Sequence, residues 1–396
     1  MDTDASSQHR TLAVAFAGAS AFLGLYATQP LLPTLERLFH VGKSTVSLTV
    51  TASTLGVALS APLVGSVADR FGRKRVIVVS ATLLALATLL NATARSLPGL
   101  VFWRFMQGLF TPGVFAITVA YVQEEWHEGA GRAMAAYVTG TVLGGFLGRI
   151  TAGLLGARLG WQVVFLFLGS LGLLAAGALH VWLPVERHFS RRGGSLRIGT
   201  IRHLRNPHLT ATFAAGFCVL FSLLATFTYI TFYLAAPPFH LGPAALGFLF
   251  FVYLVGAVIT PPCGRAIDRF GHRTVLAVSM AASIVGILLT LVPSLVVVII
   301  GLALCCSGVF VAQACANGYI GLATDRGKAL AVGLYVTFYY IGGSAGAELP
   351  GFLWRFGGWP ACVALIVVVQ SAIIAITRFG WSAHGEHSHD PLPLHS

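Results

Sequence analysis

Three ionisable side chains lie inside long apolar runs of the sequence: Arg104, Arg149 and Glu348. A charge near the centre of a membrane-spanning helix costs about 3 kcal/mol on insertion scales, so such charges mark functional sites by default. A carboxyl group in that setting can exchange a proton between dry and wet surroundings, and a guanidinium can bind an anionic group. The three residues therefore indicate proton coupling or the binding of an anion.

The three side chains share one expected depth. At 1.5 Å of rise per helical residue, each lies about 8–12 Å below the outer boundary of its run. Such a layer permits an arginine–glutamate pair with a spare cation, or a site that attracts an anionic group. For Glu348, proton exchange competes with a permanent salt bridge or an outer gate. For Arg149, a functional role and a structural role both remain open.

The elements that must position these charges are apolar runs about 20 residues long. Hydrophobic residues make up 56% of the 396-residue chain and charged residues 10%, a balance that excludes a soluble globular protein. About 20 apolar residues in a helix cross about 30 Å of hydrocarbon, so the sequence predicts an all-α membrane protein. Twelve transmembrane helices are expected, at 11–32, 45–66, 76–95, 98–121, 132–157, 161–183, 209–234, 243–265, 274–293, 295–320, 329–353 and 359–380.

Two patterns recur at half the chain length. Segment 65–76 returns almost intact at 264–275, and Gly144, Gly145, Gly148, Gly153 and Trp161 recur as Gly342, Gly343, Gly346, Gly351 and Trp359. The recurrence predicts two parallel six-helix bundles, and the glycine spacing indicates close helix packing, with a flexible seam as the alternative. Four units are expected: an N-terminal bundle 1–183, a cytoplasmic basic linker 184–208, a C-terminal bundle 209–380 and a His-containing cytoplasmic tail 381–396.

The basic residues set the expected orientation. With the N-terminus inside, 18 of the 25 Lys and Arg residues fall on the cytoplasmic side, where positive residues are retained during insertion. Both termini of a multi-pass inner-membrane protein are therefore expected in the cytoplasm, and residues 1–10 are expected to lead into a retained helix. The net charge of +12 then reflects topology and contact with lipid, and no nucleic-acid partner is expected.

Neither a metal ion nor a cofactor is expected in the helices. The six cysteines fall inside predicted spans without a C-x-x-C spacing, which favours a packing role. The tail from His384 to Asp390, with His387 and His389, has a spacing that can bind a transition metal, but a disordered polar tail is the expectation. The chain has no P-loop, so an ion gradient must drive any transport.

Three motifs together resemble the major facilitator superfamily: the turn Gly65-x-x-x-Asp69-Arg70-Phe-Gly72-Arg73, the run Arg104-x-x-Gln107-Gly108, and the glycine-rich stretch from Gly144. Tyr26-Ala-Thr-Gln29-Pro30 and the stretch ending in Gly148-Arg149 also resemble the YnfM-type bacterial transporters, which are grouped with drug- and sugar-efflux proteins. One departure concerns this stretch. Drug/proton antiporters commonly carry Gly-Pro where this chain has Gly148-Arg149, so the antiporter signature is incomplete.

The resemblance implies roles for further residues. In the resembled fold, helices 1, 4, 7 and 10 line a central cavity, and the arginine that matches Arg104 is tied to proton coupling or substrate binding. Polar residues of these helices are therefore candidates for the cavity wall, with interhelical hydrogen bonding as the alternative. The candidates are Tyr26, Gln29, Gln107, Thr118, Tyr229, Tyr233, Gln313, Asn317 and Tyr319.

The charged turn is a candidate conformational latch. Asp69 stands at a helix end, where a carboxylate can meet an arginine, and Gly72 permits a tight reversal. The basic cluster can bridge to Glu124 and Glu125, and in the resembled family this turn latches the outward-open state. An orientation signal in a solvated turn is the alternative. The latch residues are Gly65, Asp69, Arg70, Gly72, Arg73, Glu124 and Glu125, with Asp268 and Arg269 in the copy.

These features predict a secondary transporter that works by alternating access as a monomer. The first hypothesis is export of a small organic solute or drug in exchange for protons. The second is uptake of a sugar or organic anion with protons, in which Arg104 and Arg149 attract the anion. A membrane enzyme or a non-transporting sensor is the third, but no catalytic cluster or signalling domain is visible, so the chain is not expected to be an enzyme.

Overall fold

The computed structural model describes residues 2–126, 129–186, 196–324 and 328–381, and these residues form helices and short connections without a strand. The basic stretch 187–192 of the predicted linker and the tail 382–396 with its histidines lie outside the described residues. A short helix α8 (Leu196–Leu204) is the described part of the linker that leads into the second half.

The first half runs from α1 to α7. Its elements are α1 (Asp2–Leu23), η1 (Gln29–Leu31), α2 (Leu32–Phe39), α3 (Lys43–Phe71), α4 (Arg73–Asn91), α5 (Leu97–Glu125), α6 (Ala130–Leu159) and α7 (Trp161–Trp182). The second half comprises α9 (Pro207–Ala235), α10 (Pro243–Phe248), η2 (Leu249–Phe251), α11 (Val252–Ile259), α12 (Cys263–Leu289), α13 (Leu295–Ala323) and α14 (Lys328–Gly380). α14 contains a reversal at Gly357 and Gly358, where Gly358 has a φ of 57°.

Nine helices of the described residues are long and apolar enough to cross a membrane. They differ from the twelve predicted runs for local reasons. The first run breaks after Leu23, the run 243–265 is divided among short helices, and the last two runs both lie in α14. The count of twelve membrane crossings stays a prediction.

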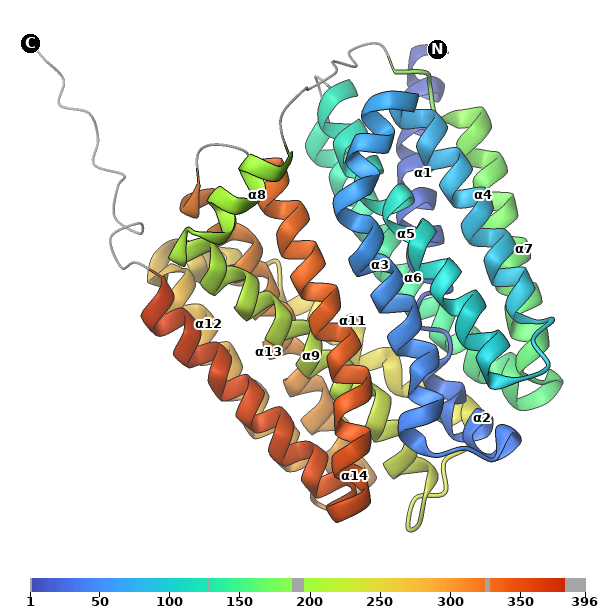
Figure 1. The fold of residues 1–396 in the computed structure, drawn as a ribbon, viewed down its shortest axis with the longest axis vertical. Coiled ribbons are helices and arrows are strands. Elements are labelled where there is room, and N and C mark those ends of the chain that lie inside the picture. Colours follow the sequence, from blue (N-terminus) through green and yellow to red (C-terminus); the bar gives the residue numbers. More distant parts are fainter. Residues whose placement is uncertain (1, 127–128, 187–195, 325–327, 382–396) are drawn as a thin grey trace, which may run out of the picture.

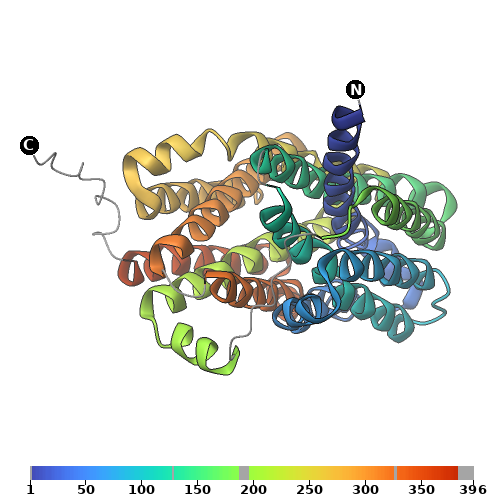
Figure 2. The same cartoon turned by 90° about the horizontal axis from the view of Figure 1, so that it is seen from above.

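The two halves lie side by side as bundles of roughly parallel and antiparallel helices (Figure 1). They meet at the end of the molecule that carries α2, here called the α2 end, and they diverge toward the end at which α1 begins and α14 ends, here called the terminal end (Figure 1). Figure 2, which looks down on the terminal end, shows the helices of each half clustered on its own side. Side chains that join the halves are therefore sought at the α2 end.

The repeated glycines bring equivalent helices together in each half. A Cβ added at Gly144 of α6 would lie 2.2 Å from the Ala19 carbonyl oxygen of α1, and one added at Gly342 of α14 would lie 2.0 Å from the Phe217 carbonyl oxygen of α9. Only glycine permits such an approach between backbones. The repeat in the sequence thus corresponds to one repeated helix contact, α1 with α6 and α9 with α14.

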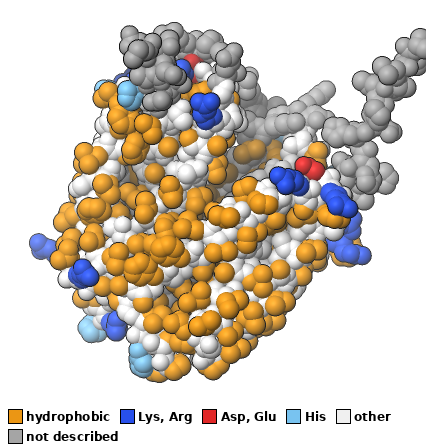
Figure 3. All heavy atoms as spheres, turned by 180° about the vertical axis from the view of Figure 1, so that it is seen from behind, with side chains coloured by type: hydrophobic (Ala, Val, Ile, Leu, Met, Phe, Trp, Pro, Cys, Tyr) orange, Lys and Arg blue, Asp and Glu red, His pale blue; other side chains and the backbone are white. Residues whose placement is uncertain are grey.

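Large hydrophobic side chains cover the outside of both halves. Figure 3 shows them over most of one face, with Lys and Arg side chains near its margins. Leu174 is 72% exposed and Val258 is 73% exposed. In water such a continuous apolar surface would cause aggregation, whereas lipid tails cover it without cost. The exterior therefore agrees with a multi-pass membrane protein.

Candidate functional site

The halves are joined at the α2 end by polar contacts between α3 and α14. Ser44 Oγ donates to a Glu348 carboxylate oxygen. The hydroxyl groups of Thr54 and Ser344 lie 2.8 Å apart, and Thr51 Oγ1 donates to the Ser344 carbonyl oxygen at 3.5 Å. The second carboxylate oxygen of Glu348, Oε2, is buried without a hydrogen-bond partner among the described residues. We call this contact the α3–α14 seam.

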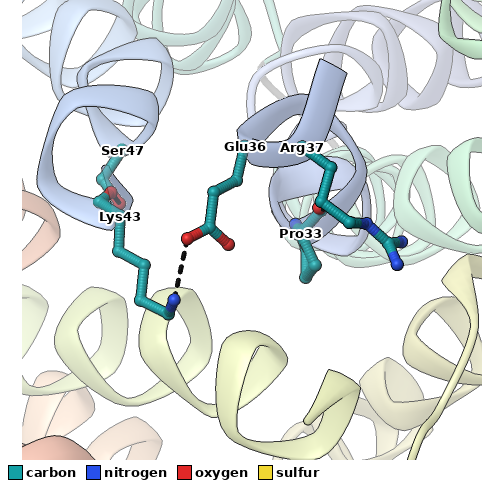
Figure 4. A network of polar contacts seen from close by, with 5 residues as sticks. All are labelled: Pro33, Glu36, Arg37, Lys43 and Ser47. Carbon is teal, nitrogen blue, oxygen red and sulfur yellow. Dashed lines mark hydrogen bonds and ion pairs between the residues drawn. The ribbon is translucent and has the colours of Figure 1, made fainter. Parts of the chain in front are cut away.

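A lysine closes the same end of the molecule. Lys43 Nζ, at the start of α3, lies 2.7 Å from Glu36 Oε1 of α2, and Figure 4 shows the two side chains pointing toward each other. The same ammonium group lies 5.5 Å from the Phe232 ring centroid and 5.6 Å from that of Trp354, both in the second half. A cation over an aromatic face is attracted by the ring quadrupole. Lys43 therefore links α2 to the aromatic surface of the other half.

Arg149 projects from α6 into a cage of aromatic rings. Its guanidinium carbon lies 4.7 Å from the ring centroid of Tyr26, 4.9 Å from that of Phe250 and 4.6 Å from that of Tyr253. Arg149 Nε donates to Gln29 Oε1 at 2.8 Å, and Nη1 donates to the Gly145 carbonyl oxygen at 2.8 Å. The residue is only 3% exposed. The described residues place no carboxylate against it.

The cage joins the two halves. In the first half, Tyr26 precedes η1 and Gln29 begins it. In the second half, Phe250 belongs to η2 and Tyr253 to α11. Gly153, one turn along α6 from Arg149, has so little space that an added Cβ would lie 2.8 Å from the Gly247 Cα atom. This close approach of α6 and α10 brings the rings of the second half to the guanidinium.

Arg104 has a different environment, entirely within the first half. The side chain is 0% exposed, and each of its five N–H groups has an acceptor. Nε donates to the Thr49 carbonyl oxygen at 3.0 Å. The two Nη atoms donate to the carbonyl oxygens of Gly24 at 2.7 Å and Leu25, to Gln107 Oε1 at 2.6 Å and to Ser53 Oγ at 3.0 Å.

The break in the first run supplies these acceptors. α1 ends at Leu23, and Pro30 and Pro33 follow closely, where proline lacks the N–H that a continuing helix needs. The carbonyl groups of Gly24 and Leu25 can then accept from a side chain, and a helix C-terminus carries partial negative charge. Arg104 thus fastens the end of α1 to α3 and α5.

Three of the predicted latch residues, Asp69, Arg73 and Glu124, meet at the terminal end. Arg73 Nη2 lies 2.8 Å from Asp69 Oδ1, and Arg73 donates to both carboxylate oxygens of Glu124 at 3.1 and 3.0 Å. Gly72 has a φ of 91°, which favours glycine. In the copied turn Gly271 has a φ of 81°, and Asp268 and Arg269 are exposed.

A family model described as Major Facilitator Superfamily matches residues 14–236 and 229–391. The chain belongs to the major facilitator superfamily.

Relatives of this superfamily member are named as transporters. The chain is 33% identical to the MFS-type transporter YybF of Bacillus subtilis (strain 168), over 94% of this chain and 93% of the relative. It is also 33% identical to the inner membrane transport protein YnfM of Escherichia coli (strain K12), over 94% and 91%. The crystal structure of the nucleoside transporter NupG shares the fold, with a TM-score of 0.78 at 13% identity, over 92% and 99%. The resemblance to the superfamily and to YnfM is confirmed.

The three intramembrane charges of this superfamily member do not form one cluster. Glu348 contacts Ser44, and no arginine forms an ion pair with it among the residues that the structure describes. The arginine–glutamate pair, one of the two arrangements left open by the sequence, is therefore absent from this conformation. Arg149 faces aromatic rings and Arg104 faces neutral oxygen atoms.

The predicted cavity residues separate into three groups. Tyr26 and Gln29 contact Arg149, and Gln107 joins Arg104 to Thr88, whose hydroxyl oxygen lies 2.6 Å from Gln107 Nε2. A second group packs helices within the second half. Its members are Tyr229, which donates to the Ala347 carbonyl oxygen, Tyr233, which stacks on Trp359, Gln313, which accepts from Tyr339, and Tyr319, which stacks on Trp381.

The remaining two candidates make no contact with the charged groups. Thr118 Oγ1 donates to the Val114 carbonyl oxygen of its own helix at 2.7 Å, and Asn317 is exposed. Sequence reasoning missed Ser44, Lys43 and Tyr253. The resemblance places the cavity wall on helices 1, 4, 7 and 10, and Tyr253 lies in the eighth expected run, 243–265, which was therefore not considered. The sequence pattern does not show which polar side chain of one half faces a buried arginine of the other half.

Proposed function

We propose that this superfamily member is a secondary active transporter that moves a small organic solute across the inner membrane by alternating access, as a monomer, in exchange for protons. The α2 end would face the outside and the terminal end the cytoplasm, so this conformation would be inward-facing. The observation that carries the proposal is the place of Glu348, a carboxylate within the seam that must separate when the outside opens.

Glu348 would bind and release the proton as the seam opens and closes. In the closed seam Ser44 donates to one carboxylate oxygen of Glu348, and the other oxygen is buried without a partner among the described residues, so this second oxygen is the one that would carry the proton. When α3 and α14 separate, water reaches the carboxyl group and stabilises its charge. The membrane potential adds about 2.3 kcal/mol per charge moved across 100 mV, so inward proton movement drives export of the solute.

Uptake with protons is the second candidate. Arg149 favours it, because a permanent positive charge where the two halves meet suits an anionic solute. A proton taken up with a monoanion leaves the loaded transporter with the same total charge as the empty one. Export and uptake predict opposite proton movements for the same solute gradient.

Reconstitution in acid-loaded vesicles with an internal pH dye tests the proposal. A solute added outside should make the interior more alkaline if the protein exchanges solute for protons, and more acid if the two move together. Glu348→Gln should abolish the proton movement and retain exchange of labelled solute between the two sides.

Two results would contradict the proposal. Full proton-driven transport by Glu348→Gln would exclude Glu348 as the proton carrier. Solute transport by the wild type without any proton signal would exclude proton coupling.

A further inference from the structure

Arg149 has hydrogen-bonding capacity that the described part of the chain leaves unused. A guanidinium carries five N–H groups, and Arg149 makes two hydrogen bonds, from Nε to Gln29 and from Nη1 to the Gly145 carbonyl. Arg104, by contrast, uses all five. The rings of Tyr26, Phe250 and Tyr253 pack around the guanidinium of Arg149 without accepting these hydrogen bonds. N–H groups that point outward along the guanidinium edge suit a carboxylate, which they can bind in a bidentate manner.

Two neighbours of Arg149 also hold unpaired donors. Because an arginine N–H can only donate, the amide oxygen of Gln29 must face it, and the amide nitrogen is then turned to the other side. That nitrogen, Gln29 Nε2, is buried without an acceptor, and so is the hydroxyl group of Tyr253. Gln29 is 0% exposed and Tyr253 is 7% exposed. Unpaired buried polar groups are costly, so two such donors on residues that contact Arg149 call for an acceptor near it.

The surroundings of these donors are aromatic. The Tyr340 side chain lies beside the Tyr26 hydroxyl group, and its ring centroid lies 5.5 Å from that of Tyr339. Phe115 of the first half lies 6.3 Å from the Tyr340 ring. Rings that surround a site favour a ligand that is itself a flat ring, since offset and edge-to-face contacts between rings are favourable. No acidic side chain contacts Arg149 among the described residues, so the site has an unneutralised positive charge.

We propose that the solute is a small aromatic monocarboxylate, whose carboxylate binds the Arg149 guanidinium edge together with the Gln29 amide and the Tyr253 hydroxyl. This inference rests on the proposed transport function and names its substrate class. The ring of the solute lies among the side chains of Tyr26, Tyr253 and Tyr340.

The site is completed by both halves, which couples binding to movement. Gln29 and Arg149 belong to the first half and Tyr253 to the second. Arg149 is 3% exposed in this conformation, so a ligand reaches the guanidinium edge when the rings of the second half move away from it. Once bound, the carboxylate bridges donors of the two halves and favours their closure around it.

Equilibrium binding to the purified full-length chain in detergent tests the chemistry. The labelled probes are benzoate, phenylacetate and salicylate, with benzyl alcohol, benzylamine and acetate as matched compounds that lack either the negative charge or the ring. At least one aromatic carboxylate should bind. The affinity of each matched compound should be lower by a factor of about 10 or more. Failure of all three carboxylates, or equal binding of benzyl alcohol or acetate, would overturn the proposal.

Variants locate the site. Arg149→Gln should weaken carboxylate binding about 10- to 100-fold, and Tyr253→Phe, which removes only an unpaired hydroxyl group, should weaken it about 3- to 10-fold. Arg149→Lys should restore part of the affinity. Arg158→Gln, an exposed arginine of the same helix, is the control and should bind as wild type. If Arg149→Gln does not fold, Tyr253→Phe and Gln29→Leu decide; unchanged affinity in the folded variants would mean that Arg149 only holds the halves together.

The vesicle assay separates this inference from the proposed function. Proton movement with benzyl alcohol or benzylamine but with none of the carboxylates would overturn the substrate class and leave proton-coupled transport intact. Carboxylate binding that depends on Arg149, without any proton movement, would support the site and contradict the proposed coupling.

Discussion

Arg104 and Arg149 are two buried arginines in one membrane protein. They differ in how many of their N–H groups are bonded and in which half supplies their neighbours. Arg104 has an acceptor for every N–H group, and all of these acceptors belong to the first half. Arg149 makes two hydrogen bonds and otherwise contacts aromatic rings, two of them from the second half. A side chain with no free donor cannot bind a solute unless it gives up hydrogen bonds within its own half. A side chain with free donors where the halves meet can bind one without that loss.

The comparison extends to the residues around each arginine. Arg104 holds a helix end, a feature that would stay fixed in the proposed cycle of alternating access. The rings around Arg149 hold a contact that would separate in each such cycle. The contact between α3 and α14 has the same character, because hydroxyl groups and one carboxyl group join the helices there, and the described residues form no ion pair between these two helices. Weak and reversible contacts suit a surface that opens.

The largest expected difference is in stability. Arg104→Met should lower the free energy of unfolding by about 3 kcal/mol or more, because the carbonyl groups of Gly24 and Leu25 and the Gln107 amide lose their donor in a buried site. Arg149→Met should cost about 1 kcal/mol or less, since an apolar chain of similar length fits among the rings. Thermal unfolding in detergent, followed by circular dichroism, measures both. Equal losses of unfolding free energy in the two variants would contradict the distinction between a structural Arg104 and a solute-binding Arg149.

A smaller difference is expected at the glutamine beside each arginine. Gln107→Leu removes one acceptor of Arg104 and the link to Thr88, and it should cost about 1–2 kcal/mol of unfolding free energy. Gln29→Leu also removes an acceptor, but its amide nitrogen has no partner to lose, so about 0.5–1 kcal/mol is expected. The same unfolding measurement applies. A larger loss in Gln29→Leu than in Gln107→Leu would show that the Arg149 site carries more of the fold than its contacts indicate.

The sequence predicts the helices and the two halves of this molecule better than it predicts the side-chain contacts between them. Long apolar runs and the two copies of the charged turn suffice for an all-α membrane protein in two halves, since hydrophobic length and local turn chemistry are properties of short segments. The Arg73–Glu124 ion pair was also predictable, because both residues stand at neighbouring helix ends. The cage around Arg149 was not, because it depends on how close α6 approaches α10 and on the break after Leu23. Depth along a helix placed Glu348 and Arg149 in one layer, but depth does not determine which helices are neighbours.

The smallest expected effect separates two adjacent residues of α3. Ser53 accepts from Arg104 at 3.0 Å, whereas the Thr54 hydroxyl lies 2.8 Å from that of Ser344 in the other half. Ser53→Ala should therefore lower the unfolding free energy by about 1 kcal/mol and leave the balance between open and closed states unchanged. Thr54→Val removes a hydrogen bond between the halves, so the loss falls on the closed state and not on the open one. The loss of about 1 kcal/mol there should instead raise the ratio of open to closed α2 ends about fivefold.

Distances between spin labels measure that ratio directly. Labels introduced as non-natural amino acids at Leu38 of α2 and Phe248 of α10, both exposed, leave the six native cysteines in place. Thr54→Val should increase the population with long label separations, and Ser53→Ala should match wild type. If Ser53→Ala opened the α2 end as much as Thr54→Val, the Arg104 clamp would itself be part of the moving contact. The division of labour between a fixed arginine and a mobile one depends on that not occurring, because a helix end that loosened with each cycle could not hold Tyr26 and Gln29 in position for Arg149.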